Sequence, residues 1–227
     1  IKKELICNLQ NFFIIILSLV NFFLNFFLLY FSNVFYVNIE ELDYTIIFLS
    51  IIHLQMFIIP LFSLLLSYDI ILKERELGIL NLFLSYPFMY YNLLYGKIFG
   101  YWFVLCIAFF IGFMPNFIFL SGVSNSSNFF IFFIFLCFLL SFIFILMGTY
   151  ISLLFKDRTV IILCSIICWL FFVFFYDFFF IIFLILNDTI VANNLSSYLL
   201  LLNPVEIFRV CAIMCFSSSI LEEIFGF

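Results

Sequence analysis

Residues 129–155 read FFIFFIFLCFLLSFIFILMGTYISLLF, a stretch without a single Asp, Glu, Lys or Arg. A run of this length exceeds the ~20 residues that a helix needs to cross the roughly 30 Å hydrocarbon core of a bilayer. Its apolar residues are continuous and do not alternate with polar ones, so a strand of a membrane β-barrel is excluded. The stretch therefore predicts a membrane-spanning helix.

Other parts of the 227-residue chain are similarly apolar, and the predicted spans lie at about residues 12–36, 44–68, 98–120, 129–155 and 160–186. The composition agrees, because 68% of the residues are hydrophobic and only 9% are charged. Soluble domains contain roughly 25% charged residues, so a soluble globular enzyme is excluded. The expected fold class is all-α, a polytopic bundle of transmembrane helices in a single domain over residues 1–227.

The Lys and Arg residues predict how these spans are oriented. If the N-terminus is cytoplasmic, all eight except Arg209 fall on the cytoplasmic side. This bias predicts a multi-pass protein of the inner (plasma) membrane with its N-terminus inside. Residues 187–227 would then form an outer-face segment, with interfacial helices as one possibility, and we expect a sixth span beyond Phe227. The net charge of −5 and the lack of a basic patch argue against a nucleic-acid partner.

Charged residues and helix breakers gather in residues 69–97, between the second and third predicted spans. Lys73, Glu74 and Glu76 share one side of a short predicted helix, and Pro87 ends the helical structure because the residue before a proline avoids the α region. A charged helical segment of this kind suits the docking of a soluble motor protein. An ordinary solvated loop with a surface helix is the alternative that spacing alone leaves open.

Three motifs in order resemble the ABC-2-type permeases. The first combines Tyr68-Asp69, Glu74-Arg75-Glu76-Leu77-Gly78, Ser85-Tyr86-Pro87 and Gly96-Lys97. The second is the aromatic run Trp169–Asp177, and the third is Leu200–Arg209, which reads LLLNPVEIFR. The latter two are similar to the subfamily that serves maturation of nitrous oxide reductase, and the resemblance covers essentially the whole chain.

This resemblance implies the permease subunit of an ABC transporter, working as a homodimer in the lipid bilayer. It implies a cytoplasmic NosF-like ATPase, a periplasmic NosD-like protein, and a transported species needed for the copper site of nitrous oxide reductase. The chain has no Gly-rich nucleotide-binding loop, so we expect no enzymatic activity and no bound cofactor, with ATP used by the partner. The implied ATPase-coupling residues are Asp69, Glu74, Glu76, Gly78, Leu80, Pro87, Gly96 and Lys97.

The outer segment holds the expected contacts to a partner outside the membrane, Asn203, Pro204, Glu206 and Arg209. Asn203-Pro204 predicts the end of one helix and the start of another, because proline at a first helical turn loses no needed N–H. Glu206 and Arg209 then share a face and can pair. An exposed pair contributes only about 0.3–0.5 kcal/mol, which favours a role in recognition.

Polar residues inside the predicted spans are the remaining candidates. Asp177 is a candidate for the translocation path, with a buried structural hydrogen bond as the alternative, because a carboxylate within a span costs about 2.5–3.5 kcal/mol on insertion. His53 is expected to be a packed, hydrogen-bonded residue.

Two cysteine pairs lie four residues apart, Cys164/Cys168 and Cys211/Cys215. On a helix each pair faces one side, and thiolates suit Cu(I). Cysteine is also a common buried apolar residue, and nothing else completes a coordination shell, so no metal site is predicted.

Two alternative functions remain. A CcmB-like permease for cytochrome c maturation is another ABC-2 protein, but it gives no reason for the Leu-Asn-Pro segment. A structural membrane subunit of a respiratory complex would not need the charged segment at residues 69–97.

Overall fold

The computed structural model describes residues 12–35, 42–76, 78, 90–120, 126–186 and 199–225. Its longer elements are helices, and no strand occurs within these ranges. The helices are α2 (Phe12–Phe35), α3 (Leu42–Ser67), α4 (Asp69–Glu76), α6 (Tyr90–Gly112), α7 (Met114–Leu120), α8 (Ser126–Leu154), α9 (Arg158–Leu170), η1 (Phe171–Phe175), α10 (Tyr176–Leu186) and α12 (Pro204–Phe225).

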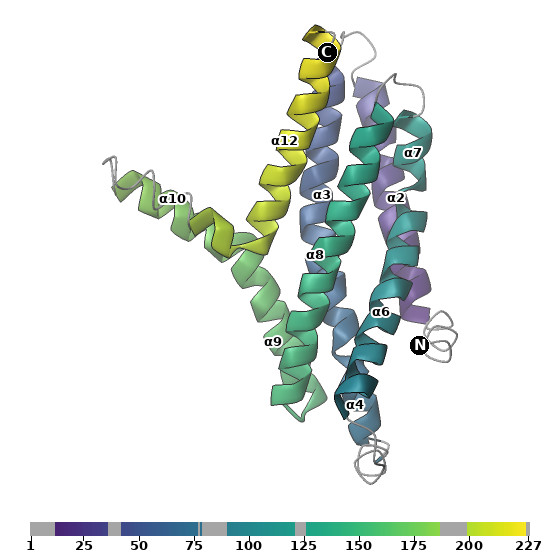
Figure 1. Ribbon diagram of the computed structural model, residues 1–227, viewed down its shortest axis with the longest axis vertical. Helices are drawn as coiled ribbons and strands as arrows, with labels where there is room; N and C mark the ends of the chain where they lie inside the picture. Colours follow the sequence, from purple (N-terminus) through teal and green to yellow (C-terminus); the bar gives the residue numbers. More distant parts are fainter. Residues whose placement is uncertain are drawn as a thin grey trace.

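The long helices form one elongated bundle (Figure 1). Helix α8 packs against α3 along much of its length, and α2 packs against α6 and α7. Helix α9 lies beside the lower part of α8, whereas α12 lies beside its upper part and also contacts α3. The helices therefore form one bundle, with α3 and α8 at its centre.

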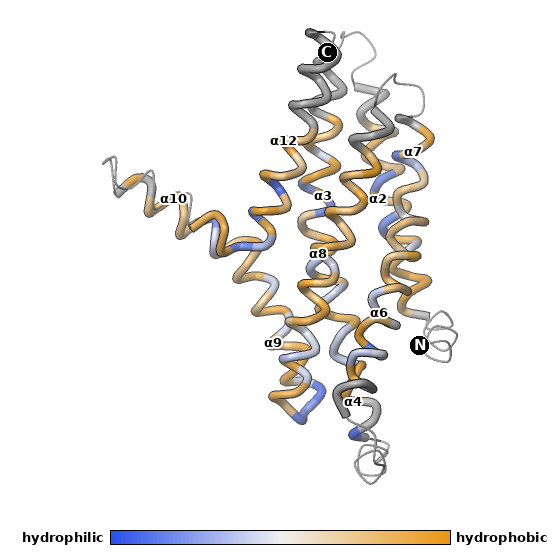
Figure 2. The backbone as a smooth tube through the Cα atoms, viewed as in Figure 1, coloured by the Kyte–Doolittle hydropathy of each residue, from blue (hydrophilic) through white to orange (hydrophobic). Residues whose placement is uncertain are grey.

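Five segments are long and apolar enough to cross a membrane, namely Phe13–Phe31, Ile47–Leu72, Leu94–Gly112, Phe130–Leu154 and Arg158–Phe183. This result confirms the predicted fold class and the five predicted spans. Hydrophobic residues cover most of the bundle (Figure 2). Hydrophilic residues lie at its lower end, near the junction of α9 and α10, and at single places on α2, α3, α7 and α12. The chain is a multi-pass membrane protein.

The third span differs from its predicted limits. Helix α6 begins at Tyr90, well before residue 98, and ends at Gly112. Phe113 forms a turn, and α7 begins at Met114. Pro115 accounts for the interruption, because it has no N–H to donate to the preceding turn.

The fifth span is bent. Between α9 and α10 the backbone forms a π-helical segment, η1, and α10 projects away from the bundle (Figure 1). The side-chain amide of Asn203 donates to the carbonyl oxygen of Phe172 at 2.8 Å. A π-helical turn whose carbonyl is taken by an inserted side chain is a recognised cause of helix bending.

Helix α12 corrects one expectation for the outer segment. An interfacial helix would lie on the membrane surface, but the first half of α12 packs against α8 and α3. Val205, Phe208 and Ala212 are buried there. Their spacing gives α12 an apolar face that fits the bundle. Residues 187–198 lie outside the described part of the chain.

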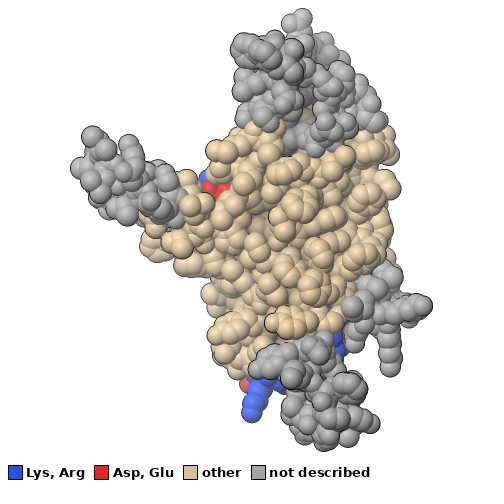
Figure 3. Space-filling view, viewed as in Figure 1, with Lys and Arg blue, Asp and Glu red and all other residues tan. Residues whose placement is uncertain are grey.

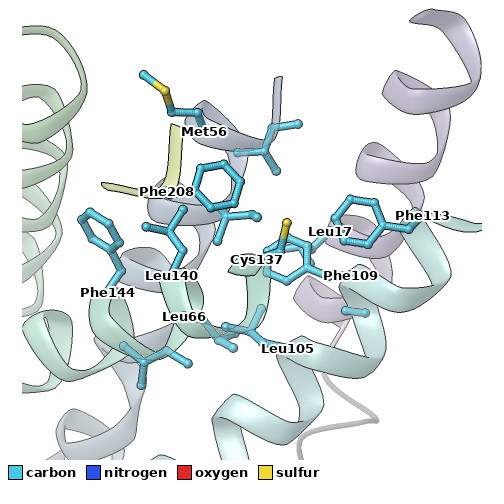
Figure 4. Packing of buried hydrophobic residues seen from close by; sticks show 14 of the residues in the cluster. Leu17, Met56, Leu66, Leu105, Phe109, Phe113, Cys137, Leu140, Phe144 and Phe208 are labelled. Carbon is cyan, nitrogen blue, oxygen red and sulfur yellow. The ribbon is translucent and has the colours of Figure 1, made fainter. Parts of the chain in front are cut away.

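Aromatic and aliphatic side chains pack together in the core of the bundle (Figure 4). The ring of Phe133 lies 6.0 Å from that of Phe113 and 5.9 Å from that of Phe208, measured between centroids. Helix association in a membrane relies on such packing, because lipid is as apolar as the side chains that it replaces.

The contact of α3 with α8 depends on small residues. A Cβ atom built on Gly148 would overlap the Oγ of Ser67. Glycine therefore allows the two central helices to approach closely at this end of the bundle.

Candidate functional site

The lower end of the bundle holds a group of polar contacts that we call the basic junction, formed by Tyr68, Arg75, Ser152 and Arg158. Helix α3 ends at Ser67, and α4 begins at Asp69 after a turn at Tyr68. The turn between α8 and α9 lies directly beside it. The basic junction therefore connects the start of the charged segment 69–97 to the loop between the fourth and fifth spans.

Arg75 on α4 binds the end of α8. Its guanidinium donates from Nη1 to the carbonyl oxygen of Phe155 at 2.6 Å and from Nη2 to that of Leu153 at 3.0 Å. The last carbonyls of a helix have no partners within the helix, and a cation there is favoured by the helix dipole. Arg75 thus caps the C-terminus of α8.

Tyr68 joins the same turn from the other side. Arg158, the first residue of α9, donates to the Tyr68 hydroxyl at 2.9 Å, and its guanidinium carbon lies 5.4 Å from the ring centroid. Ser152 on α8 donates to the Tyr68 carbonyl at 3.2 Å. The Arg158 cation also lies over the aromatic ring of Tyr68. Tyr68, the residue between α3 and α4, therefore contacts both α8 and α9.

Three of the predicted coupling residues lie on the helix that the basic junction connects to α8. Asp69, Glu74 and Glu76 belong to α4. Gly78 adopts a φ of 67° and donates its N–H to the carbonyl of Arg75 at 3.1 Å, which ends α4 in the left-handed conformation that favours glycine.

The remaining coupling residues are less closely placed. Gly96 and Lys97 lie within the first turns of α6. Leu80 and Pro87 lie outside the described residues.

A second polar group, the elbow cluster, lies where η1 and α10 meet the start of α12, and consists of Tyr176, Asp177, Asn203, Glu206 and Arg209. Asn203 accepts a hydrogen bond from the Val205 N–H at 3.0 Å, and Pro204 is the first residue of α12. This capping confirms the predicted helix start.

The predicted contact between Glu206 and Arg209 is present, but it is not an exposed pair. Arg209 donates to the Glu206 carboxylate, whose side chain is only 2% exposed. The prediction of an exposed pair is wrong because α12 packs its first turn into the bundle. Asn203 is also fully buried, so these two side chains are occupied within the chain.

Asp177 finds its partner in the same cluster. Its Oδ2 lies 3.8 Å from Nη1 of Arg209, and the two side chains are 32% and 29% exposed. The Tyr176 hydroxyl donates to the carbonyl of Leu199. Figure 3 shows acidic and basic atoms together where α10 joins the bundle.

A third polar group was not predicted from the sequence. We call it the amide cluster, and it consists of the buried carboxamides of Asn21, Asn25, Gln55 and Asn116. All four are fully buried. Asn25 bonds to Asn21 at 2.9 Å, and its Oδ1 accepts from Gln55 at 3.2 Å and from Asn116 at 2.9 Å. The cluster ties α2 to α3 and α7. The repeat of Asn21 and Asn25 four residues apart within an apolar span was the available signal.

The other sequence candidates stand apart from these groups. The side chain of His53 is exposed, so the expectation that it is packed is wrong. Cys164, Cys168, Cys211 and Cys215 form no disulfide within the described residues, and their side chains are of intermediate exposure. No cluster of three or more His, Cys, Asp and Glu side chains suited to a metal ion occurs in the part of the chain that the structure describes.

Comparison with known families gives the identity of this arrangement. Residues 12–219 match the family model described as "ABC-2 family transporter protein". The chain belongs to the ABC-2 family. The matched range contains the basic junction, the elbow cluster and the amide cluster of this ABC-2 protein, and it confirms the resemblance drawn from the three motifs.

Two curated relatives of this ABC-2 protein carry the description "Probable ABC transporter permease protein NosY". The one from Stutzerimonas stutzeri is 28% identical over 176 residues, which is 75% of this chain and 64% of the relative. The one from Pseudomonas aeruginosa is 45% identical over 64 residues, 28% of this chain and 23% of the relative. The matched stretches thus span less than two thirds of either relative.

Proposed function

We propose that the chain works with a separate ATPase that docks on the charged segment around α4. The observation that carries this proposal is the basic junction, where Arg75 and Tyr68 join α4 to both α8 and α9. A docked protein that moves α4 therefore also moves α8 and α9, because direct hydrogen bonds connect them. An ABC-2 permease needs such a connection, because the energy for transport comes from outside its own chain.

The distribution of charge supports a cytoplasmic position for this end of the bundle. The described side chains of Lys and Arg, apart from Arg209, belong to α4, to the start of α6 and to the α8–α9 turn. Figure 3 shows blue atoms at the lower end. Positive charge near the ends of spans favours the cytoplasmic side, so we assign the N-terminus to the cytoplasm and the protein to the inner membrane.

The transported species belongs to the same proposal. The names of the relatives favour a role beside nitrous oxide reductase, with a species needed for maturation of its copper site as cargo. The partners would be a NosF-like ATPase inside, a NosD-like protein outside and a second permease copy. Membership of the ABC-2 family leaves no support for a structural respiratory subunit, and the relatives' name favours this role over a CcmB-like one.

Deletion of the gene in the organism that encodes the chain tests the cargo. Nitrous oxide reductase purified from the deletion strain should lack its copper, and a reintroduced gene should restore the copper content. A chain with Lys156→Ala, an exposed residue in the α8–α9 turn, serves as the restoring control. Full copper content without the gene would reject this cargo while leaving the ABC-2 assignment in place.

A further inference from the structure

The elbow cluster contains more negative than positive charge. Its charged side chains are two carboxylates, on Asp177 and Glu206, and one guanidinium, on Arg209. With both carboxylates ionised the cluster has a net charge of −1 in a part of the chain that is otherwise apolar. Such an excess is costly in a membrane, because charges there are usually paired or neutralised.

The neighbouring helices supply no further charge. Residues 47–67 of α3, 130–154 of α8 and 171–175 of η1 contain no Asp, Glu, Lys or Arg. The titratable groups in these stretches are His53, Cys137 and Tyr150, and Tyr176 adjoins the cluster from α10. Arg209 is therefore the single cation that these elements offer to the two carboxylates.

One oxygen of the cluster also lacks a partner. The Oε1 atom of Glu206 has no hydrogen-bond partner, and the side chain that carries it is only 2% exposed. The carboxylate of Asp177 contacts the same guanidinium as Glu206, since its Oδ2 lies 3.8 Å from Nη1 of Arg209. Ionised carboxylates only accept hydrogen bonds, so neither of these two groups can donate to the other unless one of them carries a proton.

We propose that the elbow cluster is a proton-binding site in which Glu206 and Asp177 hold one proton between them beside Arg209. The proton neutralises the excess charge and supplies the missing donor. A metal cation fits less well, because the described residues offer no third His, Cys, Asp or Glu ligand at this place. The proposal extends beyond ATPase coupling and does not depend on it.

The proton predicts a particular dependence of stability on pH. In the unfolded chain both carboxyls have lost their protons well below neutral pH. The folded chain then binds one proton more than the unfolded chain, so stability falls as pH rises. Loss of the proton leaves two carboxylates beside one guanidinium at the joint between α10 and α12.

Infrared difference spectroscopy of the full chain in lipid nanodiscs tests the site directly. The wild type should show the C=O stretch of one protonated carboxyl at neutral pH, shifted in D₂O and lost on alkaline titration. Glu206→Gln and Asp177→Asn should each abolish the signal, because one carboxylate and Arg209 are already balanced. Asp157→Asn, which changes an exposed carboxylate, is the matched control and should retain it.

Survival of the signal in Asp177→Asn, or its absence from the wild type, would overturn the proposal. Thermal unfolding of the wild type provides a measurement that needs no variant. Its midpoint should fall as the pH is raised from about 4 to the pH at which the infrared signal is lost, and an unchanged midpoint over this range would also overturn the proposal. Neither experiment contains an ATPase, so a failure here leaves the docking proposal untouched.

Discussion

The guanidinium of Arg75 lies 2.6 Å from the carbonyl oxygen of Phe155, and this hydrogen bond joins residues that are 80 positions apart in the chain. It connects a short charged helix to the end of the most extensively packed span. The bond is local in space and depends on a single side chain. Its removal takes away one connection between α4 and α8 and leaves the hydrogen bond from Ser152 to the Tyr68 carbonyl in place.

Replacing Arg75 with Leu should uncouple the two parts. The change removes two charge-assisted hydrogen bonds from the end of α8 and should lower the free energy of unfolding by about 1 kcal/mol. ATP hydrolysis should continue while transport falls. Thermal unfolding and transport in proteoliposomes measure the two effects, with Lys156→Ala as the control in the neighbouring turn. Normal transport by the Leu variant would remove Arg75 from the coupling route.

Charge reversal on α4 should prevent docking of the ATPase. Glu74→Lys combined with Glu76→Lys changes the charge of the segment without touching an apolar residue. We expect the doubly substituted permease to insert normally but to lose the ATPase during affinity purification. Undiminished recovery of the ATPase would place its binding surface elsewhere.

The orientation can be read by labelling single cysteines in a chain that otherwise contains none. A cysteine at position 125 should react with an impermeant reagent added to intact cells, whereas one at position 157 should react only after the membrane is opened. Position 157 adjoins Arg158 of the basic junction. The opposite labelling pattern would reverse the assigned topology.

Removal of Arg209 should weaken the joint between α10 and α12. Arg209→Gln leaves the buried Glu206 carboxylate and Asp177 without their cation, and we expect a loss of about 1–3 kcal/mol of stability. Arg209→Lys keeps the charge and should restore most of it. The midpoints of thermal unfolding of the wild type, Arg209→Gln and Arg209→Lys, measured at the same pH, compare their stabilities. Equal stability of the Gln variant and the wild type would show that the pair contributes nothing.

Gly148→Ala tests the close approach of the central helices. The added methyl group overlaps the Ser67 Oγ, and overpacking of this kind costs about 1–3 kcal/mol. Ser67→Ala removes the nearest overlapping atom, although the Ser67 Cβ at 2.9 Å stays, so the double variant should be more stable than Gly148→Ala alone. A double-mutant cycle of unfolding free energies measures this coupling. Purely additive effects would contradict the contact.

Hydropathy predicted the five spans because a run such as residues 129–155 has only one stable place, the bilayer interior. The start of α12 was also predictable, since Asn203-Pro204 is a local signal. The bend at η1 was not. Residues 171–175 read FFVFF, with neither glycine nor proline, and the amide that takes the Phe172 carbonyl comes from a position 31 residues away.

The same limit applies to the sites. The motif drew attention to Glu74 and Glu76, whereas the contact that joins α4 to α8 belongs to Arg75 between them. Its acceptors are backbone carbonyls, which carry no residue signature. The burial of Glu206 was missed for a related reason, because the pairing with Arg209 is local but the packing of α12 depends on α3 and α8.

The elbow cluster also has a consequence for the lipid around the protein. Asp177 and Arg209 are each about one-third exposed, at 32% and 29%, beside a helix that leaves the bundle. Partly exposed charges within a bilayer draw water and headgroups toward them. The membrane next to α10 is therefore expected to be thinner than along α2, and its acyl chains less ordered. We expect this effect on the side of the protein from which α10 projects.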